Sequence, residues 1–149
     1  MIRKMLLFSL VIIVVSSCFL RREYKTSSFT YNSGGQSGTI PLKVPWGYSK
    51  KEMKDTAGIS LETFYYPNGA ILYNAYLSDT TYEIQSFDSA LHQPQIHRLG
   101  GLVYKGQDEK ELFYREIRQG HLRFGYRSVP GRLEFVFDSC TNYASLQKH

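Results

Sequence analysis

The C-terminal third of the chain alternates apolar and polar residues, and no other feature constrains the fold as strongly. The alternation covers three segments, residues 111–117, 121–127 and 132–138. Because successive side chains of a strand point to opposite faces, a period of two predicts strands that are buried on one face. Turn residues separate the segments, at Gly120 and at Val129-Pro130-Gly131. The pattern predicts an antiparallel meander with one face in water.

The segment before this meander predicts a short helix followed by a hairpin. Ser49 and Glu52 fit a capping box, in which each side chain satisfies a free backbone N–H of the other. This predicts a helix over about 50–56. Asn-Gly adopts the positive φ of tight hairpins, and it lies in the turn Pro67-Asn68-Gly69 between predicted strands 61–66 and 70–76.

The remaining segments complete an α+β prediction. Residues 78–99 lack a sustained period and predict a long loop, with a short helix near 87–91. The tail after Asp138 has apolar residues near helical spacing and predicts a terminal helix that covers the sheet. We therefore expect an antiparallel sheet of about five strands with short N-terminal and C-terminal helices. This order resembles the PsbP/Mog1-like α+β fold.

The first 18 residues have the layout of a secretory signal peptide. Arg3 and Lys4 precede an apolar run over 5–15, and the small residues Ser16 and Ser17 follow. The apolar run has 11 residues, fewer than the roughly 20 that cross a hydrocarbon core. The layout therefore predicts export from the cytoplasm.

The residues Val15-Ser16-Ser17-Cys18 resemble the lipobox of bacterial lipoproteins. In that family the cysteine thiol receives a diacylglycerol, the signal is cut before the cysteine, and the new amine is acylated. The resemblance implies that Cys18 carries a covalent lipid, such as palmitate, and anchors the chain to a membrane. An ordinary cleaved signal, or an uncleaved anchor with an incidental Cys18, are the alternatives.

Residues 1–17 form the predicted signal peptide, which is removed. The predicted mature chain then has two parts: residues 18–39 are the lipidated cysteine and a flexible polar tether, and residues 40–149 are a single α+β domain. Removing residues 1–17 takes away Arg3 and Lys4, so the formal net charge falls from +5 to +3. A charge this small, without a basic tract, argues against a nucleic-acid partner.

A second resemblance concerns the cell envelope. The mature chain starts Cys18-Phe19, without the aspartate that favours inner-membrane retention in Gram-negative lipoproteins, which implies the periplasmic face of the outer membrane. Several motifs resemble small Bacteroidetes-type lipoproteins, a family that brings no function with it: Tyr104-Lys105-Gly106, Phe113-Tyr114-Arg115-Glu116, Gly125-Tyr126 and Phe137-Asp138.

The first functional hypothesis is a non-enzymatic binding or structural module of the cell envelope, with no cofactor besides the covalent lipid. Tyrosine, tryptophan and arginine suit protein interfaces and glycan contacts. The candidate binding surface comprises Trp46, Tyr66, Tyr73, Tyr76, Arg123 and Arg127. The expected partner is an envelope protein or a glycan.

Three other interpretations stay open on the sequence. Glu116 is placed on the buried face of its strand, where a carboxylate needs a partner or acts as a general acid or base. His92 and His97 offer imidazole ligands for a metal, although their spacing matches no standard site. A lipocalin-like carrier is the third, with fewer strands than the roughly eight of such a barrel.

Overall fold

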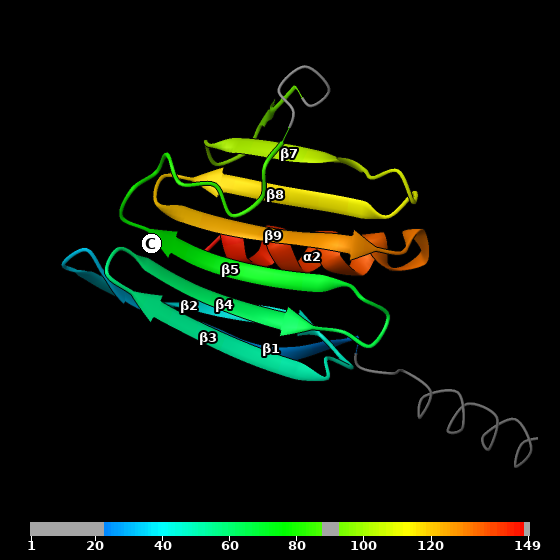
Figure 1. Ribbon diagram of the computed structural model, residues 1–149, viewed down its shortest axis with the longest axis horizontal. Coiled ribbons are helices and arrows are strands. Elements are labelled where there is room, and N and C mark those ends of the chain that lie inside the picture. The colour runs from blue at the N-terminus through cyan, green and yellow to red at the C-terminus, as the bar shows by residue number, and fades with distance from the viewer. Residues whose placement is uncertain (1–22, 88–92, 148–149) are drawn as a thin grey trace, which may run out of the picture.

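A computed structural model describes residues 23–87 and 93–147, and this part of the chain is mostly β (Figure 1). Its strands are β1 (Tyr24–Ser33), β2 (Gln36–Pro45), β3 (Lys50–Thr56), β4 (Ile59–Tyr65), β5 (Ile71–Leu77), β6 (Gln95–Ile96), β7 (Leu102–Gln107), β8 (Phe113–Gln119) and β9 (Leu122–Val129). A 3-10 helix, η1 (Gly131–Leu133), and one α-helix, α2 (Glu134–Ser145), follow them.

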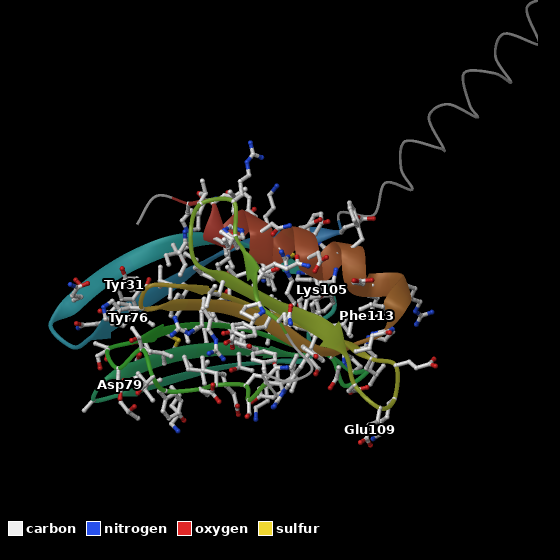
Figure 2. The ribbon with its side chains drawn as sticks, turned by 90° about the horizontal axis from the view of Figure 1, so that it is seen from above. Tyr31, Tyr76, Asp79, Lys105, Glu109 and Phe113 are labelled. Atoms are coloured by element: carbon white, nitrogen blue, oxygen red, sulfur yellow. The ribbon has the colours of Figure 1, made fainter. Side chains whose placement is uncertain are left out.

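The strands form two antiparallel sheets. Seven of them pair in the order β3-β4-β5-β9-β8-β7-β6, and β1 and β2 form a separate hairpin. The hairpin and α2 lie behind the seven-stranded sheet in Figure 1, and Figure 2 shows both on one side of it. We call the covered side the back face and the other side the front face.

The core lies between the back face and this cover. Phe64, Leu72 and Tyr126 point into it from β4, β5 and β9, and Phe29 and Val44 meet them from the hairpin. At one end the rings of Tyr31 and Tyr76 stack with centroids 4.5 Å apart, which ties the hairpin to the sheet (Figure 2).

The predicted N-terminal helix is wrong, because residues 50–56 form β3. Ser49 Oγ donates to the Tyr65 carbonyl, and Glu52 accepts a hydrogen bond from the Tyr65 hydroxyl instead of capping a helix. β3 pairs with β4 along its whole length. The capping-box pattern describes local preference alone, and pairing with a neighbouring strand overrides it here.

Residues 24–39, which were assigned to the predicted flexible tether, lie in the hairpin of β1 and β2. β1 begins at Tyr24 and pairs with β2 in ten consecutive positions. Along β1 the buried positions are few, at Phe29 and Ser33. Because most of β1 is polar and exposed, the segment has the composition of a linker although it forms a strand.

The C-terminal prediction is half right. A terminal helix does cover the back face, but it occupies Glu134–Ser145, and the segment 132–138, predicted as a strand, lies in η1 and the first turns of α2. Its buried residues are Phe137, Cys140, Thr141, Ala144 and Ser145, which follow helical spacing. The PsbP/Mog1-like α+β expectation of about five strands with two terminal helices therefore fails.

The face prediction for β8 is reversed. The hairpin turn at Gly120 places Ile117 opposite Phe124, and opposite residues of an antiparallel pair share a face. Ile117 therefore lies in the core on the back face, whereas Glu116 points to the front face.

The predicted helix near 87–91 falls largely outside the described residues. No helix within them is long and apolar enough to cross a membrane.

Candidate functional site

The front face carries a row of three residues that brings buried polar groups together. Tyr73 of β5, Gly125 of β9 and Glu116 of β8 lie opposite one another in adjacent strands. Gly125 has no side chain, and a Cβ there would overlap the end of the Tyr73 ring. The Tyr73 ring therefore crosses β9 and reaches Glu116.

Glu116 is fully buried, and both of its carboxylate oxygens accept hydrogen bonds. The Tyr73 hydroxyl donates to Oε2 at 2.5 Å, and Arg118 Nε donates to Oε1 at 2.6 Å. Burial and the neighbouring carboxylate raise the pKa of Tyr73 well above its usual value, so the hydroxyl stays protonated and donates. The two donors satisfy the buried carboxylate of Glu116 and hold it in place.

Arg118 joins this row to the segment that follows β5. Its guanidinium stacks on Tyr104 at 4.4 Å and on Phe87 at 5.4 Å from the ring centroids. It also donates to the Gln85 carbonyl and lies 3.6 Å from a carboxylate oxygen of Glu83. The contacts hold residues 83–87 over β8 and β7, where the chain crosses the front of the sheet in Figure 1.

Arg123 holds the beginning of the same segment. It is buried, and it donates to three backbone carbonyls, those of Gly120, Leu122 and Thr80, at 2.6, 2.9 and 2.9 Å. The Thr80 contact fixes the chain after β5 over β9. Residues 80–87 therefore cover one half of the front face, and β4 with half of β5 lies beside them.

A groove of about 210 Å³ occupies the front face beside this segment. Ile59, Leu61 and Ile71 form much of its floor, and Tyr73, Tyr82 and Ile84 also line it. Lys54 and Arg127 contribute the positive charges of its lining. Arg127 of β9 lies directly opposite Ile71 of β5, and Lys54 of β3 lies directly opposite Leu61 of β4.

The two cations of the groove lack an acidic partner within residues 23–87 and 93–147. The nearby acid Glu52 is already engaged, since it pairs with Lys50 and accepts the Tyr65 hydroxyl at 2.8 Å. Lys50 and Tyr65 hold the pKa of the Glu52 carboxyl below its usual range. The groove therefore combines an apolar floor with uncompensated positive charge.

Of the six residues of the predicted binding surface, Tyr73 and Arg127 both line the groove, and the other four lie elsewhere. Trp46 is 56% exposed in the β2–β3 turn. Tyr66 and Tyr76 pack in the core on the back face, whereas Tyr73 and Arg123 are buried on the front face. Of these six, Arg127 is the one that both lines the groove and is exposed.

Of the two candidate metal ligands, the structure describes only His97. His97 is buried, its Nε2 lies 3.3 Å from Ser145 Oγ, and its Nδ1 accepts from the Leu99 N–H. Burial and the positive charge of Arg115 lower the pKa of His97. His92 falls outside the described residues. Within them, no three His, Cys, Asp or Glu side chains are grouped as metal ligands.

Sequence reasoning missed most of the groove, namely Lys54, Leu61, Ile71, Tyr82 and Ile84. The alternation of β4 was the available signal, because Ile59, Leu61 and Thr63 share one face. That signal was weak, because the front face of β4 is open only where residues 80–87 do not cover the sheet. Cys18, the predicted lipidation site, precedes the described residues.

Comparison with known proteins gives no family for this chain. No family model, curated protein or solved structure matches it significantly. The features that bear on function are therefore the groove and the sequence of the N-terminal region.

Proposed function

We propose that the protein is a lipid-anchored binding protein of the cell envelope whose front-face groove holds a small ligand. The ligand has an apolar, flat body and an anionic group. One observation carries the proposal: the groove is lined by apolar and aromatic side chains and by two cations without acidic partners in the described chain. Concave apolar sites with a few placed polar groups are typical of small-molecule binding.

The ligand class follows from the lining. Tyr82, which is 51% exposed, offers aromatic surface to a flat apolar group, as stacked rings commonly do. Arg127 presents a planar guanidinium, which binds carboxylate, sulfonate or phosphate groups through two parallel hydrogen bonds. Lys54 and Arg127 lie in rows four residues apart, about 13 Å at 3.3 Å per residue, so they act at opposite ends of the groove.

The envelope location is proposed from the lipobox resemblance at Cys18. Two or three acyl chains, at about 0.8 kcal/mol per buried CH₂, give a durable anchor. Replacing Cys18 with alanine should move the protein from the membrane fraction and abolish incorporation of labelled palmitate. A Cys18→Ala protein that still incorporates palmitate would refute this part of the proposal.

The groove is tested with a matched pair of probes, 2-naphthoate and the neutral 2-naphthamide. Saturation-transfer NMR on the full chain in nanodiscs, with empty nanodiscs as the blank, should detect naphthoate binding. Arg127→Gln should weaken naphthoate by about tenfold, the equivalent of 1.4 kcal/mol, whereas Lys54→Gln, at the opposite end of the groove, should have a smaller effect. Neither change should alter the binding of naphthamide.

Control variants separate the groove from general charge effects. Arg132 and Lys110 are exposed cations of η1 and of the β7–β8 turn, and Arg132→Gln and Lys110→Gln should leave both probes unaffected. Leu61→Trp should fill the groove and remove binding of both probes. Naphthoate binding that survives Leu61→Trp would place the ligand elsewhere and overturn the groove proposal.

A further inference from the structure

We propose that the end of the domain that carries Trp46 lies on the phospholipid surface, with the Trp46 ring at the level of the headgroups. This inference rests on the proposed lipid anchor at Cys18. It concerns a different surface from the groove, and it fixes how the domain is oriented on its membrane.

The first observation is where the described chain begins. The backbone N–H of Trp46 donates to the Glu23 carbonyl at 3.1 Å, so the start of the domain lies beside the β2–β3 turn. Glu23 follows Cys18 by five residues. Five residues extend at most about 18 Å, so an acylated Cys18 holds this end of the domain close to the bilayer.

The second observation is the composition of the Trp46 cluster, which we define as Lys25, Trp46 and Tyr48. The Lys25 ammonium lies 6.0 Å from the Trp46 ring and 5.6 Å from the Tyr48 ring, and it donates to the Tyr48 hydroxyl at 3.2 Å. Tryptophan and tyrosine are enriched at membrane–water interfaces. Lysine near the surface attracts anionic headgroups.

Buried residues of the core fix the position of the Trp46 cluster. Tyr48 packs edge-on against Phe64, with ring centroids 5.1 Å apart. The buried Tyr66 hydroxyl donates to the carbonyl of Pro45, the residue before Trp46, at 3.0 Å. Trp46 is nevertheless 56% exposed, so the fold presents a large aromatic side chain to the outside at the end nearest the anchor. Arg21 and Arg22 add positive charge in the sequence between Cys18 and Glu23.

The test uses Trp46 as its own probe, because it is the single tryptophan of the chain. The full lipidated chain is reconstituted in vesicles of phosphatidylethanolamine and phosphatidylglycerol, and flotation establishes that it is attached. Trp46 emission should then shift to the blue and resist aqueous iodide. Phospholipids brominated near the headgroup should lower the emission at least about twofold, since tryptophan rings lie at that level.

The matched control moves the tryptophan to the far end of the hairpin. Ser37 is exposed and lies at the other end of β2, about 26 Å from Pro45 at 3.3 Å per residue. The Trp46→Phe, Ser37→Trp variant should be quenched by iodide and not by brominated lipid.

Each outcome separates the anchor from the orientation. A protein that does not float with vesicles overturns the anchor and this inference with it. A protein that floats while Trp46 stays open to iodide and unaffected by brominated lipid overturns the orientation alone. Equal lipid quenching at positions 46 and 37 also overturns it, because the domain would then lie flat.

Discussion

Replacing Tyr73 with phenylalanine tests the structural role of the buried front-face network. Phenylalanine keeps the ring over Gly125 and removes only the hydroxyl that donates to Glu116 at 2.5 Å. A hydrogen bond to a charged group contributes about 1.5–3 kcal/mol. Because Glu116 is fully buried and water cannot replace the donor, we expect Tyr73→Phe to cost about 2 kcal/mol of unfolding free energy.

Urea unfolding of the purified protein, followed by circular dichroism, measures this loss. With a denaturant slope of about 2 kcal/mol/M, the midpoint should fall by about 1 M. In the Glu116→Gln background the acceptor is neutral, so Tyr73→Phe should cost only about 1 kcal/mol there. The resulting double-mutant cycle should give a coupling of about 1 kcal/mol between the two residues.

Tyr65 provides the matched control. Its hydroxyl also donates to a glutamate, Glu52, but this pair lies at the surface. Tyr65→Phe should leave the urea midpoint unchanged within error, because water replaces the lost partner. Equal effects of Tyr73→Phe in the two backgrounds, or equal effects of the two tyrosine changes, would refute the reasoning.

Three further predictions concern buried positions. Gly125→Ala should cost more than Tyr73→Phe, about 3 kcal/mol or more by urea titration, because the added Cβ displaces the Tyr73 ring. Burial raises the pKa of the Cys140 thiol to about 12, so Ellman's reagent should find no thiol in the folded protein and one after unfolding; two would mean that Cys18 is not acylated. Burial also raises the pKa of Glu62, so its stabilising contribution is complete below about pH 4.5 and is lost as the pH rises through the folded pKa. Glu62→Gln should accordingly raise the melting temperature at neutral pH, with a gain that shrinks toward pH 4.5.

The sequence predicted those elements whose pattern is set by local residues. The hairpin around Asn68-Gly69 is confirmed, and the strands predicted over 111–117 and 121–127 correspond to β8 and β9 with shifted ends, because the turn residues and the period of two agree there. The segment 50–56 was assigned to a helix since Ser49 and Glu52 match a cap, and every residue of β3 is exposed. Its strand conformation depends on β4, a partner that local propensity does not describe.

The candidate site was harder to predict because it depends on both faces of the sheet. The sequence predicts a sheet with one face in water and places Arg123 on a binding surface, yet the chain after β5 covers Arg123 and supplies the Thr80 carbonyl. In β9, Ser128 has a positive φ of 57°, and the strand pairing shifts between Phe113 and Arg115. A bulge of this kind redirects side chains, and simple alternation does not reveal it.

The position of the groove follows from the polar network. The buried Glu116 holds Arg118 in place, and the partly buried guanidinium of Arg118 in turn contacts the segment after β5 at Glu83, Gln85 and Phe87. This fixes the segment over β9, β8 and β7. Within residues 23–87 and 93–147, the apolar front side of β4 then has no strand or helix over it, and Tyr82 and Ile84 of the same segment form the groove's margin. Weakening the network with Tyr73→Phe should therefore also loosen that margin and lower the affinity for 2-naphthoate, whereas Tyr76→Phe, on the back face, should not.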